Sequence, residues 1–216
     1  SALGEVVEPL DEAAMAASIS GLKGSGVEAL TVSLMNAYAN GEHEQRIRTI
    51  AEQVMPGIPV SISSEVIPEM YEYERAETTV VNSYIRPVVS KYIESLEAEL
   101  NQRMNDVQLH ILRSDGGLAS AEAAKSAPVN LLMSGPAGGV SGAIWIAKQA
   151  GYENLLTFDM GGTSTDVALI EGGVARTRRE TRVADVTVRA SSIDVRTVGA
   201  GGGSIAYVPE LTRALR

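Results

Sequence analysis

The sequence predicts an α/β fold in which short buried strands alternate with helices. An Ala-rich segment at residues 10–22 favours a helix, and the apolar run at 27–34 is typical of a buried strand. Apolar residues then recur at helical spacing over 47–54 until a Pro-Gly pair ends the pattern, and residues 59–63 again favour a strand. This order indicates parallel strands joined by helical crossovers.

One long amphipathic helix is predicted after residue 69, because apolar side chains there recur with the helical period. The stripe consists of Val81, Tyr84, Ile85, Val88, Val89, Tyr92, Ile93, Leu96, Leu100 and Met104. We expect this stripe to be packed, and Tyr71, Tyr73 and Tyr84 to lie in a core or an interface. Pro87 lies inside the stretch, where it is expected either to kink the helix or to begin a second one.

Composition and charge restrict the class of protein. The 216 residues are 44% hydrophobic and 21% charged, which is typical of a globular protein with one large core or two modest ones. A net charge of −9 favours neither nucleic acid nor an anionic membrane as a partner. No apolar stretch approaches the roughly 20 residues that span a bilayer. The absence of cysteine excludes disulfides and thiolate ligands within the chain and fits a cytoplasmic protein.

The most informative segment reads DMGGTSTD and spans residues 159–166. Apolar runs at 155–158 and 167–170 flank it, so we predict a β-hairpin whose tip contains Gly161 and Gly162. Glycine leaves the backbone N–H groups of such a tip unshielded, and converging N–H groups form a nest for a phosphoryl group. Further hydroxyl donors come from Thr163, Ser164 and Thr165. The alternative is a tight hairpin with a purely structural role.

Two carboxylates border this turn. Asp159 would face the phosphates, where a carboxylate is favourable only if a hard divalent cation offsets the like charge, so we predict magnesium at Asp159. Asp166 either has the same role or holds the turn by accepting hydrogen bonds from backbone N–H groups. The segment is not a Walker A loop, since no lysine follows the glycines, and not a Rossmann fingerprint, since a strand follows it.

A second glycine-rich stretch spans residues 199–204 and includes Gly201, Gly202 and Gly203. Consecutive glycines carry an entropic cost, which indicates close approach of a ligand or of another backbone segment; the alternative is a flexible surface loop. Residues 134–139, SGPAGG, pose a similar choice. Here we expect a loop that leads into a helix, with Pro136 in the first turn and the N-terminus of the helix closely packed.

Motifs along almost the whole chain resemble the hydantoinase A and 5-oxoprolinase family, which includes the ATP-binding subunits of acetone and acetophenone carboxylases. The resemblance is carried by these segments in a fixed order: PLDEA, YANGEHEQR, SSEVIPEMYEYERAETTVVNSYIRPV, LRSDGGL, LLMSGPAGGV, LLTFDMGGTSTDVALIEGG and VRTVGAGGGSIAYV.

The resemblance implies part of an actin-like ATPase (ribonuclease H-like) fold, with two lobes around a nucleotide cleft. Residues 1–148 would form the remainder of the first lobe, including a helix that connects the lobes. Residues 149–216 would form the start of the second lobe with the phosphate-binding hairpin. The family's earlier Asp-x-Gly-Gly-Thr loop and its later adenosine-binding part have no counterpart in this sequence, so the chain is expected to be an internal fragment that is inactive alone.

For the whole protein, the resemblance implies hydrolysis of a cyclic amide such as hydantoin or 5-oxoproline, after ATP with Mg2+ phosphorylates a carbonyl or amide oxygen. Asp159 and Asp166 would be catalytic, residues 161–165 would hold the phosphates, and residues 201–203 would let the chain approach the nucleotide. A hydantoinase B-type partner subunit or a fused second half is also implied. The alternatives are the ATP-binding subunit of an acetone-type carboxylase and a nucleotide-gated interaction module without turnover of a small molecule.

Overall fold

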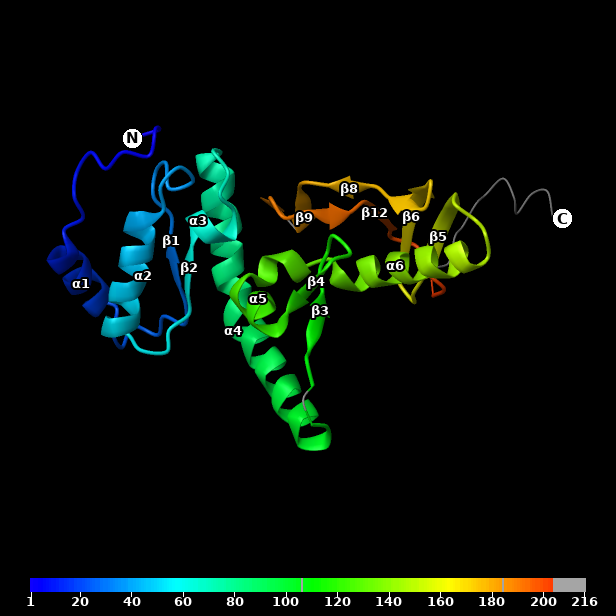
Figure 1. Cartoon of the computed structure of the whole chain (residues 1–216), viewed down its shortest axis with the longest axis horizontal. Coiled ribbons are helices and arrows are strands. Elements are labelled where there is room, and N and C mark those ends of the chain that lie inside the picture. The colour runs from blue at the N-terminus through cyan, green and yellow to red at the C-terminus, as the bar shows by residue number, and fades with distance from the viewer. Residues whose placement is uncertain (106, 184, 204–216) are drawn as a thin grey trace. The chain divides into compact units, whose positions relative to one another are not determined.

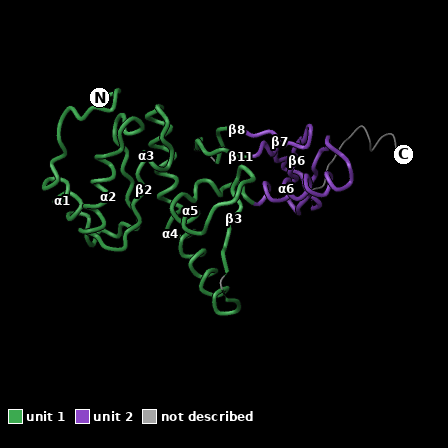
Figure 2. The backbone as a smooth tube through the Cα atoms, viewed as in Figure 1, with its two compact units in different colours: residues 1–134, 178–192 green, residues 135–177, 193–216 purple. Residues whose placement is uncertain are grey.

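The computed structural model describes residues 1–105, 107–183 and 185–203 and divides the chain into two compact units (Figure 1, Figure 2). Unit 1 contains Ser1–Ser134 and Arg178–Ser192, and unit 2 contains Gly135–Thr177 and the chain from Ile193 onward. Both units combine helices with strands, so the predicted α/β class is confirmed. The predicted lobe boundary after residue 148 stays a prediction, because compactness alone does not identify lobes.

The first part of unit 1 is a parallel strand pair with a helical crossover. Strand β1 (Leu30–Val32) pairs with β2 (Val60–Ile62) in parallel register, and helix α2 (Glu42–Val54) connects them. Helix α1 (Glu12–Ser20) begins where the Asp11 carboxylate accepts a backbone hydrogen bond from the first turn. The predicted crossover is therefore confirmed, although both strands are shorter than the apolar runs suggest. The core here contains Ile19, Ile47, Ile50, Ala51, Val60 and Ile62.

A long helix dominates the middle of unit 1. Helix α4 (Glu72–Arg103) follows the four-residue helix α3 (Ser63–Val66) and continues through Pro87, so the proline does not begin a second helix. The first half of α4 is unusual because polar side chains form most of its buried face. These are Arg75, Thr78, Thr79, Asn82 and Ser83.

The predicted packing of the apolar stripe of α4 is wrong at several of its positions. Tyr84 and Tyr92 on the stripe and Tyr73 beside it are 83%, 66% and 72% exposed, and none of them lies in a core. The face of α4 that packs against the rest of unit 1 is instead the polar one, and its side chains have hydrogen-bond partners there. For example, Asn82 Nδ2 donates to Ser61 Oγ at 3.0 Å. A buried polar group that keeps a hydrogen-bond partner loses little free energy when it leaves water. The buried face of a helix therefore need not be the one that the hydrophobic pattern predicts.

A pair of short strands returns to unit 1 and packs against α4. Strands β9 (Thr181–Val183) and β10 (Val186–Val188) are antiparallel, and the Arg189 N–H donates to Thr78 Oγ1 at 2.9 Å. The Arg189 guanidinium carbon lies 4.6 Å from the centre of the Tyr71 ring, a cation–π distance. Tyr71 therefore contacts a distant segment of the chain, while half of its surface remains exposed.

A hairpin and two short helices complete the chain of unit 1 before unit 2 begins. Strands β3 (His110–Leu112) and β4 (Leu118–Ser120) are antiparallel, and Gly116 in the turn between them has φ +85°. Helix α5 (Ala121–Ser126) begins with a serine cap, and the 3-10 helix η1 (Pro128–Leu131) follows.

Unit 2 is an antiparallel sheet covered by one helix. Helix α6 (Ser134–Gln149) has Pro136 in its first turn as predicted, but it already begins at the serine, where the sequence suggested a loop. Strands β5 (Leu155–Met160) and β6 (Thr165–Glu171) form the predicted hairpin, and β12 (Val195–Val198) pairs with the other edge of β6. The core between helix and sheet contains Ala137, Val140, Ala168, Ile170, Ile193 and Val195.

Three short strands complete the described chain. Strand β7 (Val174–Ala175) pairs with β6, and β8 (Thr177–Arg178) pairs with β11 (Ser192–Ile193). Within residues 1–105, 107–183 and 185–203, no helix combines the length and the apolar character needed to cross a membrane.

Candidate functional site

The β5–β6 hairpin places the two predicted carboxylates opposite each other. Antiparallel register pairs Asp159 with Asp166, so both lie on one face of the sheet. Ala168, two residues further along β6, lies on that face and belongs to the core beneath α6. Both carboxylates are therefore on the helix-covered face, where the strands meet the glycine turn. The Gly161 N–H donates to the Ser164 carbonyl at 2.9 Å and closes this turn.

The second glycine-rich stretch lies directly against the turn. The N–H groups of Gly202 and Gly203 donate to the carbonyl oxygens of Gly161 and Gly162, at 2.9 Å each. Gly201 is buried, and a β-carbon on it would lie 2.6 Å from the Gly161 oxygen. The structure thus brings together two predicted segments about 40 residues apart and favours close backbone approach over a free surface loop. The last residue of the predicted stretch lies outside the described residues.

The two carboxylates differ in their contacts. Asp166 Oδ1 accepts a hydrogen bond from Thr197 Oγ1 at 2.6 Å, across the β6–β12 pair. Within the described part of the chain, the exposed Asp159 side chain has no hydrogen-bond or ion-pair partner. Its Oδ2 lies 3.9 Å from the place of a β-carbon on Gly139 of α6. Both carboxylates line an open hollow of about 290 Å³ between α6 and β5, so Asp159 is available to a ligand.

The two carboxylates of the hairpin suit magnesium better than a metal that needs a full set of protein ligands. Among the residues that the structure describes, no group of three or more Asp, Glu or His side chains could hold a metal ion. Magnesium, however, needs only one or two carboxylates when waters and phosphate oxygens complete its shell. Like charges directly opposite each other destabilise a sheet, and a divalent cation would offset that repulsion. Asp159 and Asp166 therefore fit magnesium that is bound together with a phosphate ligand.

The tip of the turn has the features of a phosphate nest. Residues 161–164 are exposed or partly exposed, and a β-carbon on Gly162 would have no atom within 4 Å. Backbone N–H groups and hydroxyls at such an uncovered tip are suited to an anion. Thr165 differs from its neighbours, because it is 4% exposed and its Oγ1 donates to the Ala200 carbonyl at 2.6 Å.

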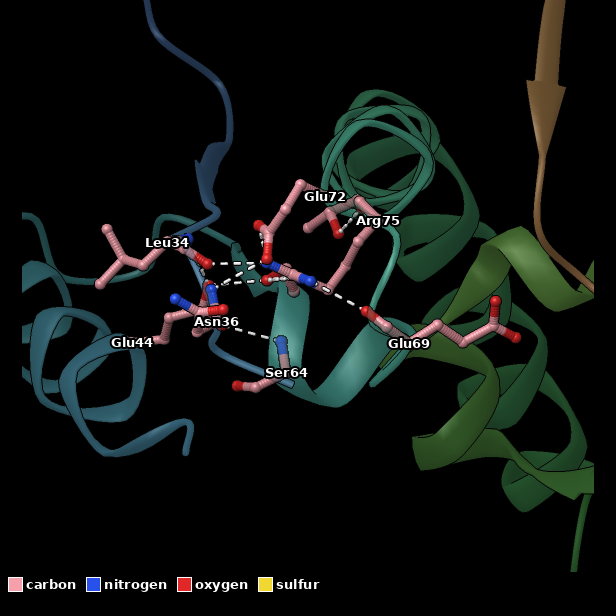
Figure 3. A network of polar contacts seen from close by, with 9 residues as sticks. Leu34, Asn36, Glu44, Ser64, Glu69, Glu72 and Arg75 are labelled. Atoms are coloured by element: carbon pink, nitrogen blue, oxygen red, sulfur yellow. Dashed lines mark hydrogen bonds and ion pairs between the residues drawn. The ribbon is translucent and has the colours of Figure 1, made fainter. Parts of the chain in front are cut away.

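Unit 1 contains a second polar cluster, which the sequence reasoning missed. The Glu44 carboxylate is buried and accepts hydrogen bonds from the N–H groups of Leu34 and Ser64 and from the Ser63 hydroxyl, each at 2.7 Å (Figure 3). Arg75 is fully buried and donates from Nε to Ser63 Oγ at 3.0 Å. One hydroxyl thus links two buried charges.

The two terminal nitrogens of the Arg75 guanidinium also have partners. The guanidinium donates to the carbonyl oxygens of Glu69 and Leu34, at 2.8 Å each, and forms an ion pair with Glu72 (Figure 3). The other oxygen of Glu72 accepts the Asn36 N–H at 2.9 Å. Burial acts to raise the pKa of Glu72, but the hydrogen bonds from Asn36 and Arg75 outweigh it and hold the pKa below its usual range.

This cluster, the Glu44–Arg75 network, ties together the loops that follow β1 and β2. The carboxyl ends of parallel strands are a common place for ligands, but here the charged atoms are committed to the protein itself. A signal was present in the sequence, because Glu44 shares a helical face with the apolar Ile47 and Ala51. A charge on an apolar helix face predicts a buried partner.

Comparison with known proteins identifies similar sequences over the whole chain. The profile described as Hydantoinase/oxoprolinase matches residues 75–216, and that of the Hydantoinase/oxoprolinase N-terminal region matches residues 1–55. Caprolactamase subunit alpha of Pseudomonas jessenii is 35% identical over 96% of this chain and 30% of its own length. The 5-oxoprolinase of Saccharomyces cerevisiae is 34% identical over 93% of this chain and 15% of its own length. The chain thus spans a third or less of either relative.

Solved structures show the same similarity. The crystal structure of ATP-dependent caprolactamase from Pseudomonas jessenii aligns with a TM-score of 0.83 and 35% identity, over 96% of this chain and 30% of that one. The nucleotide-free structure of acetone carboxylase, from a study of ATP-dependent acetone carboxylation, aligns with a TM-score of 0.79 and 29% identity, over 99% of this chain and 30% of that one.

Proposed function

The chain belongs to the hydantoinase/oxoprolinase family, and on this premise we propose that it carries the phosphate-binding part of an ATP-dependent enzyme. The enzyme would hydrolyse a cyclic amide of the hydantoin or 5-oxoproline class. Because the chain spans a third or less of its relatives, the activity would require a longer full-length protein. The observation that carries the proposal is an exposed glycine turn bordered by two opposed carboxylates.

Each predicted residue has a place in this proposal. Residues 161–164 would hold the phosphate, with the N–H groups of residues 162–164 and the hydroxyls of Thr163 and Ser164 as donors, while the Gly161 N–H closes the turn on the Ser164 carbonyl. Asp159, which is exposed and without a partner among the described residues, would be the main ligand of Mg2+, and Asp166 would complete the carboxylate pair. When bound, Mg2+ with ATP supplies a phosphoryl group that makes an amide or carbonyl oxygen a better leaving group. Thr165 and residues 201–203 belong to the same site, behind the turn.

We also propose an actin-like fold for the full-length protein, with residues 1–148 in the first lobe and 149–216 in the second. The arrangement of helix α6 followed by an antiparallel hairpin is consistent with a connecting helix that leads to a phosphate loop. A partner subunit or a fused second half is expected, because the matched caprolactamase chain is itself an alpha subunit. The proposed location is the cytoplasm, on the basis of the cysteine-free composition.

A carboxylase subunit is the second candidate. It is favoured by the similarity of the whole chain to acetone carboxylase, at a TM-score of 0.79. Both candidates would use the same phosphate turn, since activation of an oxygen by phosphorylation can precede either hydrolysis or carboxylation. They differ in the substrate that the full-length protein consumes and in the step that follows phosphorylation.

Turnover by the full-length protein with its partner subunit tests the proposal. ATP-dependent consumption of 5-oxoproline and hydantoin should be measured beside consumption of acetone with bicarbonate. For the preferred substrate, Asp159→Ala should lower kcat/KM by about 100-fold or more, as expected for loss of the ligand that holds the charge-neutralising Mg2+ at the phosphates. Glu94→Ala removes an exposed carboxylate on α4 and is the matched control. Normal turnover by Asp159→Ala would exclude the assigned role.

A further inference from the structure

Given the proposed nucleotide site, we propose that Thr165 and the segment Gly201 to Gly203 form a brace behind the glycine turn. They are positioning residues that fix the shape of the turn, and the groups that meet phosphate are restricted to residues 161–164. The two glycine-rich segments would then have different roles. Residues 161–164 would face the ligand, and residues 201–203 would support residues 161–164 from the other side.

The hydrogen bonds of the second segment support this division. The N–H groups of Gly202 and Gly203 donate to the carbonyl oxygens of Gly161 and Gly162, at 2.9 Å each. An N–H group has one proton to donate, so these two donors are committed to the turn and are not free for a phosphate oxygen. The carbonyl groups of Gly161 and Gly162 are thus held by the second segment, and the Gly161 N–H is held by the Ser164 carbonyl. The backbone donors that the proposal assigns to phosphate are therefore the N–H groups of residues 162–164.

Gly201 is required for close approach rather than for an unusual backbone conformation. Its φ is not in the left-handed region. A β-carbon on Gly201 would lie 2.6 Å from both the Gly161 oxygen and the Thr163 nitrogen, and 2.7 Å from the Gly162 carbonyl carbon. All three are backbone atoms of the turn, so they cannot move aside as a flexible side chain could. Any side chain at Gly201 would therefore push the two segments apart.

Gly162 shows the opposite environment within the same contact. A β-carbon there would meet no atom within 4 Å, because the residue faces open space. An alanine at Gly162 would therefore leave the brace intact and would obstruct only a ligand at the tip. Gly201→Ala and Gly162→Ala are thus a matched pair of variants with the same chemical change on opposite sides of the turn.

Thr165 extends the brace by one side-chain bond. Its hydroxyl is buried and donates to the Ala200 carbonyl at 2.6 Å, so it is committed to the segment that leads into the glycines. Thr165→Val keeps the shape and removes the bond, whereas Thr165→Ser keeps the hydroxyl. The functional gain from such a brace is preorganisation, because a turn that already has its bound shape need not be ordered by the nucleotide.

Hydrogen–deuterium exchange on the full-length protein tests the brace without reference to activity. In the peptide that covers residues 157–166, Thr165→Val should speed exchange by about fivefold, the loss of one hydrogen bond, and Thr165→Ser should restore it. Gly201→Ala should speed exchange further, while Gly162→Ala should match the unmodified protein. Equal exchange in Thr165→Val and the unmodified protein, or equally fast exchange in both glycine variants, would overturn the proposal.

Kinetics with Mg-ATP then show whether the brace positions the turn for the nucleotide or only stabilises the fold. Thr165→Val should raise KM for Mg-ATP by about fivefold with little change in kcat, and Thr165→Ser should be normal. Saturating Mg-ATP should remove the difference in exchange, since the ligand orders the same turn. An unchanged KM in Thr165→Val would overturn the brace as a positioning device. If the unmodified protein binds no Mg-ATP, the proposed function fails, while the exchange data still report whether the brace exists.

Discussion

The Glu44–Arg75 network of unit 1 and the Asp159–Asp166 pair of unit 2 are both clusters of charged side chains within helices and strands, yet they differ in burial and in partners. Glu44 and Arg75 are 1% and 0% exposed, and each is surrounded by hydrogen-bond partners of the chain (Figure 3). Asp159 is exposed and lacks a side-chain partner among the described residues. It also faces a second carboxylate rather than a cation.

The difference separates a structural cluster from a ligand site. Buried charges are tolerated only when the chain itself satisfies them, and such a cluster then has nothing left to offer a ligand. Two like charges held opposite each other carry a cost that the chain does not relieve, and that cost is a reason for a cation to bind. The Glu44–Arg75 network, here called the closed cluster, should therefore control stability. The Asp159–Asp166 pair, here called the open pair, should control ligand binding.

The largest expected effect is on the closed cluster. Arg75→Met removes the buried cation and leaves the Ser63 hydroxyl, two backbone carbonyls and the Glu72 carboxylate without their donor. The free energy of unfolding should fall by about 3–5 kcal/mol, as for other broken buried networks. Urea denaturation measures it. Arg103→Met is the matched control, because Arg103 is 72% exposed and should lose less than about 0.5 kcal/mol. Similar losses in both variants would contradict the structural role.

A smaller effect concerns the pH dependence of the same network. The pKa of Glu72 is held below its ordinary value of 4.5 by Asn36 and Arg75. A depressed folded-state pKa contributes stability that is present above the unfolded value and is lost as pH falls through the folded value. Glu72→Gln should therefore flatten the fall of Tm below about pH 4.5. Thermal melts from neutral to acidic pH test this, with Glu94→Gln as the control for charge loss, and an unchanged acid profile would contradict it.

The smallest expected effect is on the stability of the open pair. Asp159→Asn removes one of two opposed like charges at an exposed position, so the free energy of unfolding should stay within about 0.5 kcal/mol or rise slightly. The same urea experiment measures it. A loss comparable to that of Arg75→Met would place Asp159 in the structural class and remove the contrast between the two regions.

Local pattern predicted much of the fold but not all of it. The β5–β6 hairpin and the β1–α2–β2 crossover could be predicted, because strand and helix periods are short-range properties of the sequence. The packing of α4 could not, because its buried face carries Arg75, Thr79 and Asn82 and a hydropathy pattern assigns such residues to solvent. Their burial depends on partners far along the chain, as with Asn82 and Ser61.

The candidate site shows the same division. The glycines and carboxylates of DMGGTSTD could be singled out from composition and spacing alone. The contact of Gly202 with Gly161 joins segments about 40 residues apart, and no local signal specifies which partner a glycine-rich stretch approaches. The difference between buried Thr165 and the exposed tip at Thr163 likewise appears only once β12 and its extension lie beside β6.

The most direct test of the central claim is calorimetric titration of Mg-ATP into the full-length protein, its Asp159→Asn variant and its Glu94→Gln control. If the open pair of unit 2 is the nucleotide site, the unmodified protein and the control should bind with equal affinity. Asp159→Asn should bind at least about tenfold more weakly, a loss of about 1.4 kcal/mol or more. Equal affinity in all three proteins would show that the nucleotide does not depend on this hairpin and would contradict the account.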